Sequence, residues 1–503
     1  MERRVKVKGK ALIILTFIYI YVPIVIFLFG FTKIWIAILT IAATAPFVVR
    51  MVNDFIQSEV SRDTVEISYL IFFAVIVIII ALCLMLGIGG IYPQAGDWFK
   101  HNAVLRDLTL KKWPVFYESN ESCMLTYYLG QYLFPALIGK LFDSFEVSNL
   151  MLCSYSIYGL IIVYLYLIRI VNANNWKKQL ITLLVMFFFC GALTLCQTVI
   201  RAVYEDEMFS EGSYHWVLIR DIMLQYRSNL IMIRWVLPQI VVSWIVVLVF
   251  MENIQKVEYY VALILPVILF GSFSLATLAV MALCMAIVQL LKHDITINKI
   301  FSLSNILPAI SLGLVLFFYF LGNIQTNKPY NSSFRWQTYS NGAIGVYLIF
   351  CLFMFGIYSI CVYKENKNNP LFYINVAILL FLPWCKMGLC NDIVMSGSIP
   401  SLFILMIYVL RLLFDDGEST SLGIRKGIVI VFLFIGALYP LRELHDNVAA
   451  NGKGMDMGDG YYSMEYFTDR SNNDLQEDLV YNYYTYDMDG KTFYEYISRK
   501  KAK

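Results

Sequence analysis

Residues 96–108, GDWFKHNAVLRDL, place five charged or titratable side chains between two long apolar runs. If this stretch is a helix from Asp97, then Asp97, Lys100 and His101 share one face, because residues three and four apart are helix neighbours. A carboxylate beside cationic groups suits a base that deprotonates a hydroxyl next to a held phosphate. Asp97 and His101 are then catalytic candidates, and Lys100 and Arg106 phosphate-binding candidates. Alternatively, Asp97 only caps the helix and the rest is a solvated interfacial face.

A second polar stretch carries arginines at a regular spacing. In YHWVLIRDIMLQYRSNLIMIRWVLPQ, Arg220, Arg227 and Arg234 recur every seven residues. Seven steps return a helix to within about 20° of the same direction, so a continuous helix would align all three. Such a row suits phosphate or pyrophosphate recognition, and attraction to anionic lipid headgroups explains it equally well. A helix break at QYRSN would spoil the alignment.

A third polar stretch, KMGLCNDIVMSGSIP (386–400), contains Asn391 and Asp392 just before an apolar run. One interpretation is a capping or turn role. The other is a substrate-binding role, with Asp392 as a second carboxylate facing the same surface as Asp97. In that case we expect both carboxylates beside one cavity that opens to water and to lipid. A divalent metal is compatible with this site, although no ligand set in the sequence demands one.

The elements that position these residues are membrane helices. Of the 503 residues, 59% are hydrophobic and 15% charged, and the mean hydropathy is +0.66. Repeated apolar runs of about 17–25 residues are typical of helices that cross a bilayer. The expected fold class is an all-α integral membrane protein. A net charge of +3 is too small to indicate a nucleic-acid partner.

The sequence predicts about 13 transmembrane helices, joined by long outer loops that carry interfacial helices. The expected spans are 11–31, 33–50, 67–89, 148–170, 179–199, 236–252, 258–271, 274–291, 303–323, 343–363, 370–386, 398–414 and 424–441. The short pair 258–271 and 274–291 is either two thin spans or a re-entrant hairpin. A moderately apolar segment at 125–142 is expected to lie in the membrane interface.

Basic residues in the loops predict the orientation. The N-terminal MERRVKVKGK places the N-terminus in the cytoplasm, and alternation then puts the other short basic loops on the same side. The long polar segments fall outside, including a first outer loop at 90–147 and a second at 200–235. We therefore expect a polytopic domain at 1–441 in the cytoplasmic membrane, followed by a short extracytoplasmic tail at 442–503.

These features resemble the GT-C class of membrane glycosyltransferases. The resemblance rests on Gly96 and Asp97 at the start of the first outer loop, on the 125–142 segment, and on the outward-facing polar motifs. The segments GDWFKHNAVLRDL, WPV, QYRSN and CNDIVMSGSIP also resemble an uncharacterised family of bacterial multi-spanning membrane proteins. The GT-C class uses lipid-phosphate-linked sugar donors and an acidic base in the first outer loop. The resemblance therefore implies that Asp97 is the base.

The resemblance implies an enzyme that moves a sugar from a polyprenyl-phosphate donor to an envelope glycan, lipid or protein acceptor. A first alternative is a lipid-linked polysaccharide polymerase or ligase, which would depend on the arginines more than on Asp97. A second alternative is a non-enzymatic lipid or glycan transporter. The small number of charged residues within the spans and the polar content on one side disfavour the transporter.

Overall fold

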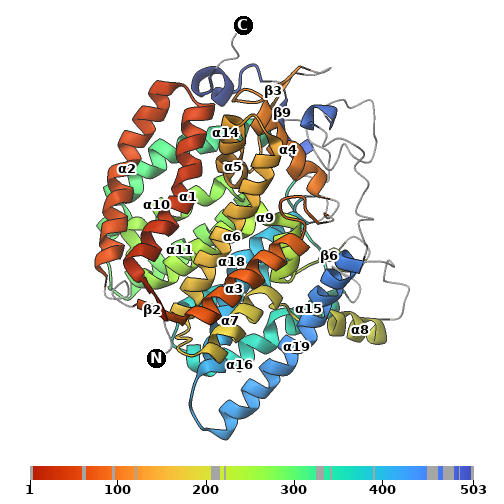
Figure 1. The fold of residues 1–503 in the computed structure, drawn as a ribbon. Helices are drawn as coiled ribbons and strands as arrows, with labels where there is room; N and C mark the ends of the chain where they lie inside the picture. The colour runs from red at the N-terminus through yellow and green to blue at the C-terminus, as the bar shows by residue number, and fades with distance from the viewer. Residues whose placement is uncertain are drawn as a thin grey trace.

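The computed structural model is a bundle of helices with little sheet (Figure 1). The structure describes residues 4–58, 64–92, 94, 97–118, 122–204, 216–219, 222–324, 333–339, 343–388, 391–449, 463–467, 481–486 and 488–499. Gly96 and Arg220, which the sequence singles out, lie outside these residues.

Within the described residues, nine helical segments are long and apolar enough to cross a membrane. Seven are single helices: α1 (Gly9–Phe31), α2 (Ile34–Gln57), α6 (Phe145–Ile170), α9 (Asn229–Glu252), α11 (Ser272–Leu291), α18 (Asp392–Phe414) and α19 (Thr420–Ala449). Two segments join shorter pieces: α12 (Ile297–Ile300), α13 (Leu303–Pro308) and α14 (Leu314–Ile324), and then α15 (Ala343–Cys351) and α16 (Ile357–Asn366). The multi-pass helical class is therefore confirmed.

Four further apolar segments are bent or short. The helices α7 (Trp176–Phe188) and α8 (Leu193–Val203) meet at 48°. The shorter helices are α3 (Tyr69–Met85), the segment Val257–Leu269 around α10 (Tyr260–Ile264), and the segment Pro370–Trp384 that begins with α17 (Pro370–Phe381). Each expected apolar run coincides with one of the helical segments. The number of 13 crossings stays a prediction, as does the choice between two thin spans and a re-entrant hairpin.

Short antiparallel strands tie distant segments together. The pairings are β1 (Arg4–Lys8) with β2 (Thr64–Ser68), β3 (Phe116–Tyr117) with β4 (Cys123–Leu125) and β9 (Tyr484–Tyr486), β5 (Val217–Ile219) with β6 (Ile222–Leu224), and β7 (Arg335–Trp336) with β8 (Cys385–Lys386). The three-stranded sheet joins the first outer loop to the C-terminal tail, which the sequence did not predict.

The first outer loop holds two helices, α4 (Trp98–Leu110) and α5 (Gly130–Leu141). The sequence placed one helix across 125–142 in the membrane interface. The observed α5 begins later, because the chain before it forms β4 and a turn. Most of α5 is buried, and it packs against α1, α4 and α6 inside the bundle. The helix is therefore packed inside the protein, and its placement in the membrane interface stays a prediction.

The helices α9 and α18 form the centre of the bundle (Figure 1). Both are buried along nearly their whole length, whereas α2 and α19 lie at the periphery. The central pair is apolar around its circumference, as expected for helices enclosed by other helices. The rings of Trp244 and Phe403 stack between them at 4.9 Å.

Pro238 breaks α9 near one end. Proline has no N–H to donate to the carbonyl four residues earlier and collides with it, and the backbone just before Pro238 is non-helical. The freed carbonyls of Arg234 and Trp235 accept hydrogen bonds from α4. The indole Nε1 of Trp98 donates to the carbonyl of Arg234 over 2.9 Å. Nε2 of His101 lies 3.2 Å from the carbonyl of Trp235. The break therefore fixes α4 against the central helix.

Several helices extend beyond the predicted spans. The span expected at 236–252 begins at Asn229, because Ser228 caps the helix by accepting a hydrogen bond from the Ile231 N–H. The last helix continues past 441 to Ala449. Its added turns are held by contacts that Glu443 and Asn447 make with Arg234 of α9.

The N-terminal and C-terminal segments lie at opposite ends of the bundle (Figure 1). The strand β1 leads directly into α1, and Thr32, just after α1, forms a bridge with Ser498 of the tail. This arrangement accords with an inner N-terminus and an outer C-terminus, although the orientation itself stays a prediction.

Labelling of introduced cysteines tests the orientation. Tyr496→Cys, at a position 64% exposed in the tail, should react with an impermeant maleimide in intact cells. Glu418→Cys, in the exposed loop beyond the far end of α18, should react only after permeabilisation. The native cysteines among the described residues are buried or partly buried and give a low background. The opposite labelling pattern would overturn the orientation.

Candidate functional site

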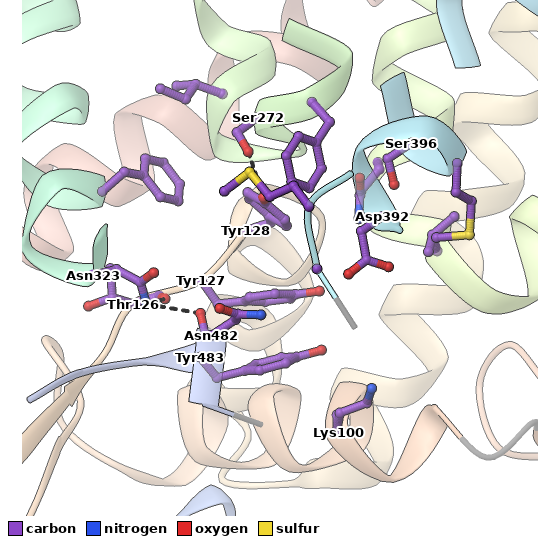
Figure 2. A pocket seen from close by; sticks show the side chains of 18 of the residues that line it. Lys100, Thr126, Tyr127, Tyr128, Ser272, Asn323, Asp392, Ser396, Asn482 and Tyr483 are labelled. Atoms are coloured by element: carbon purple, nitrogen blue, oxygen red, sulfur yellow. Dashed lines mark hydrogen bonds between the residues drawn. The ribbon is translucent and has the colours of Figure 1, made fainter. Parts of the chain in front are cut away.

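A cavity of about 340 Å³ lies where α4, the broken part of α9, the start of α18 and the C-terminal tail meet. Its polar side chains include Asp97, Lys100, Tyr127, Asn323, Asp392 and Tyr483, and its apolar side chains include Ile268, Phe273, Phe317, Phe320 and Ile324. The two carboxylates that the sequence placed on one surface therefore share one cavity. Figure 2 shows Lys100 and Asp392 pointing into the same space from different helices.

Asp97 precedes α4 but does not cap it. Its backbone is helical and its side chain makes no capping hydrogen bond, so the alternative interpretation of Asp97 as an N-cap is wrong. Its Oδ1 instead lies 2.6 Å from Nζ of Lys100, one helical turn on, and the Lys100 side chain is only 9% exposed. The helix spacing predicted this pairing. The result is an ion pair at the edge of the cavity.

His101 lines the cavity as a neutral side chain. Its Nδ1 lies 2.5 Å from the hydroxyl of Tyr132 and its Nε2 3.2 Å from the carbonyl of Trp235. Burial lowers the pKa of His101 to about 4. His101 is therefore not one of the cationic groups that the sequence predicts beside Asp97. His101 fixes the position of α4 on the break in α9.

Asn391 and Asp392 have different roles: Asn391 forms a turn, and Asp392 lines the cavity. Asn391 adopts a left-handed conformation with φ 53°, and its side-chain amide donates to the carbonyl of Met223. Its Oδ1 accepts a hydrogen bond from the N–H of Met387. Asn391 is therefore a turn residue and does not line the cavity. The turn directs Asp392, the first residue of α18, into the cavity.

Two tyrosines form a wall of the cavity. Tyr127 lies in the first outer loop and Tyr483 in the tail, and their rings stack at 3.8 Å. Burial raises the pKa of both phenols, so both remain protonated at neutral pH. Figure 2 shows their hydroxyls pointing toward the space between Lys100 and Asp392. The sequence indicated a tyrosine-rich tail but did not indicate that Tyr483 reaches this site.

The predicted row of arginines does not form. The capping residue Ser228 begins α9 after Arg227, so Arg227 lies in the extended segment before the helix that contains Arg234. The guanidinium of Arg234 donates hydrogen bonds to Glu443 over 2.5 Å and to Asn447 over 2.7 Å. Arg227 is buried and lies over the rings of Trp216 and Trp235. Neither guanidinium lines the cavity, and Arg220 lies outside the described residues.

The other end of α4 holds the tail. Asp107 is fully buried, and its Oδ2 accepts hydrogen bonds from the Tyr117 hydroxyl, the Ser463 hydroxyl and the Met464 N–H. Burial raises the pKa of Asp107. Arg106 lies beside it at 3.6 Å and not in the cavity. Arg106 is therefore placed next to the tail anchor and not where a bound phosphate would lie.

Two polar side chains of the cavity wall keep an oxygen without a partner. Gln239 Oε1 and Ser396 Oγ are buried and have no hydrogen bond with any described residue. A buried polar atom without a partner costs about 1–3 kcal/mol. Both residues line the cavity, and the sequence did not point to either.

No group of three or more His, Cys, Asp and Glu side chains among the described residues is arranged to hold a metal ion. Comparison of the chain with protein-family models, curated proteins and solved structures finds no match. The function proposed below therefore rests on the geometry of the cavity and on the resemblance of the sequence motifs.

The neutral His101 predicts a pH dependence of stability. The unfolded chain binds a proton at His101 below about pH 6.5, whereas the folded chain does so only near its pKa of about 4. The contribution of His101 is therefore complete above about pH 6.5 and is lost as the pH falls toward 4. At pH 5 the loss is about 2 kcal/mol. When the pH is lowered from 7 to 5 in detergent, the unfolding temperature should fall less for His101→Gln than for the native protein. Equal decreases in the unfolding temperature would contradict a neutral His101.

The Asp107 anchor predicts that its removal loosens the tail. Asp107→Ala leaves three donors without their acceptor, and those of Tyr117 and Met464 are buried, which costs about 1–3 kcal/mol for each buried donor. We expect a lower unfolding temperature and faster protease cleavage within the tail. Asp294→Ala, at an exposed carboxylate, is the control. Equal cleavage rates in the Asp107→Ala and native proteins would show that the tail is held by other contacts.

Proposed function

We propose that the chain is a glycosyltransferase of the cytoplasmic membrane that acts on the outer face. It transfers a sugar from a polyprenyl-phosphate donor to a cell-envelope glycan, lipid or protein. The observation that supports this proposal is one cavity lined by a buried lysine, two carboxylates, and several aromatic and aliphatic side chains. A lipid-linked phosphate sugar needs polar side chains around its phosphate and sugar and apolar side chains around its lipid chain.

The polar side of the cavity suits the transfer step. When a glycosidic bond to phosphate breaks, negative charge develops on the phosphate, and a fixed cation stabilises it. Lys100 is that cation, because its ammonium is buried at the cavity wall. One of the two carboxylates takes the proton of the acceptor hydroxyl. The hydroxyls of Tyr127 and Tyr483 are donors for the sugar or phosphate oxygens.

The apolar side suits a lipid chain. Phe317 and Ile324 of α14 line the cavity, and they are also 52% and 65% exposed on the bundle surface. The cavity wall is therefore continuous with an apolar outer surface of the helix bundle. A donor whose chain remains in the bilayer could place its phosphate next to Lys100 without leaving the lipid.

A second candidate, a lipid-linked polysaccharide polymerase or ligase, is favoured by Arg227. This cation is buried, and no carboxylate of the described residues pairs with it. It contacts Trp235, which also lines the cavity. In a polymerase, Arg227→Lys would abolish chain extension from lipid-pyrophosphate substrates, and substitution of Asp97 or Asp392 would have little effect.

The proposed function predicts that Lys100 binds the donor phosphate. Purified protein in lipid vesicles should transfer label from radiolabelled polyprenyl-phosphate sugars to an envelope acceptor fraction. Loss of a hydrogen bond to a charged group costs about 1.5–3 kcal/mol. Lys100→Gln should therefore raise the donor KM about 10–100-fold. Lys112→Gln, on the same loop but exposed, is the matched control.

A native protein that transfers no label from any donor in the pool would count against the proposed function. A Lys100→Gln protein with the native donor KM would remove Lys100 from the phosphate site without affecting the proposed reaction class.

A further inference from the structure

We propose that Asp392, and not Asp97, is the base that takes the proton of the acceptor hydroxyl. This inference rests on the proposed transferase function and assigns the roles of the two carboxylates within it. The observation that separates them is the partner of each carboxylate.

Asp97 is committed to Lys100. The two charged groups lie 2.6 Å apart, and the Lys100 side chain is 9% exposed and the Asp97 side chain 33% exposed. The carboxylate of Asp97 is the ion-pair partner of the buried Lys100 ammonium, and loss of one partner leaves the other charge buried without a counter-charge. Asp97 is therefore already engaged by Lys100 when no substrate is bound. Its role is to hold Lys100 at the cavity wall, which makes it a positioning residue.

Asp392 forms no ion pair with a described residue. Among the described residues, no lysine or arginine nitrogen lies within 4.0 Å of the Asp392 carboxylate oxygens, so Asp392 forms no ion pair with them. No described side chain donates a hydrogen bond to it. The carboxylate lines the cavity and is half-buried. A carboxylate that lacks a partner and faces a cavity is free to accept a proton from a bound group.

The cavity places the other participants around this carboxylate. Figure 2 shows Lys100 and Asp392 approaching one space from opposite sides, with the hydroxyls of Tyr127 and Tyr483 between them. The proposal places the donor phosphate next to Lys100 and the anomeric carbon on the side of Asp392. The acceptor hydroxyl would enter between that carbon and the Asp392 carboxylate.

The proposed step is balanced within these groups. The acceptor oxygen forms a bond to the anomeric carbon while its proton moves to Asp392. The bond between that carbon and the phosphate oxygen breaks, and its electron pair leaves with the lipid phosphate. Lys100 stabilises the charge on the leaving phosphate, and Asp392 then returns its proton to water.

The test compares matched variants in the vesicle assay. Asp392→Asn should reduce kcat about 10²–10⁴-fold, because general-base assistance is lost, with little change in the donor KM. Asp97→Asn should mainly raise the donor KM, since Lys100 loses the group that holds it, and should leave kcat within about tenfold. Asp392→Ala and Asp97→Ala are then assayed with added formate, a carboxylate small enough for the vacated space. Formate should restore transfer in Asp392→Ala only.

The outcomes separate the two proposals. Loss of kcat in Asp97→Asn with near-native kcat in Asp392→Asn, or formate rescue of Asp97→Ala alone, overturns the assignment of Asp392 and leaves the transferase intact. Absence of transfer by the native protein counts against the proposed function itself. Each variant is first compared with the native protein in thermal unfolding, and if Asp392→Asn does not fold, the formate response of Asp392→Ala decides.

Discussion

The break in α9 at Pro238 frees backbone carbonyls inside an apolar bundle, and the site depends on how they are satisfied. Neither lipid nor apolar side chains can hydrogen-bond them, and an unsatisfied group there costs several kcal/mol. Trp98 and His101 supply the donors. Because both belong to the first turns of α4, the same contacts place Asp97 and Lys100 at the cavity. His101 therefore contributes to the site by position, and its low pKa keeps the hydrogen-bond pattern intact at neutral pH.

The buried charges of the bundle fall into two groups. Arg169 pairs with Glu252, and Arg234 with Glu443, and these pairs connect helices away from the cavity. Breaking such a pair is costly because the remaining charge stays buried, so they serve the fold. The half-buried carboxylate of Asp392 is different, because no described lysine or arginine forms an ion pair with it and it lines the cavity. Charge that the fold leaves unpaired beside a cavity is available to a ligand.

The C-terminal tail forms part of the cavity wall through Asn482 and Tyr483. Asp107 and the strand pairing of β4 with β9 attach it to the first outer loop, and Tyr483 then completes the cavity wall. The amide of Asn323, at the end of α14, donates to the carbonyl of Tyr484 over 2.8 Å. The tail thus bridges the polar α4 side and the apolar α14 side of the cavity. Changes far along the chain are expected to affect the site through this bridge.

The membrane class and the positions of the apolar helices followed from the sequence, because long apolar runs have few alternatives to helices in a bilayer. The pairing of Asp97 with Lys100 followed from helix periodicity. The row of arginines did not, because a cap at Ser228 outweighed the seven-residue spacing. Ser228 was a readable signal of that break, as was Pro238, whereas nothing local marked the partners Glu443 and Tyr483.

The sequence by itself therefore determined which segments are helices and which local pairs share a face, since both depend on neighbouring residues and on the surrounding medium. Only the tertiary structure decided which of the polar residues meet in one cavity. Asp97, Asp392 and Tyr483 come from three segments that lie far apart in the sequence. Their meeting depends on the packing of α4 on α9 and of the tail on α4, and such packing depends on shape and hydrogen-bond satisfaction across the whole bundle.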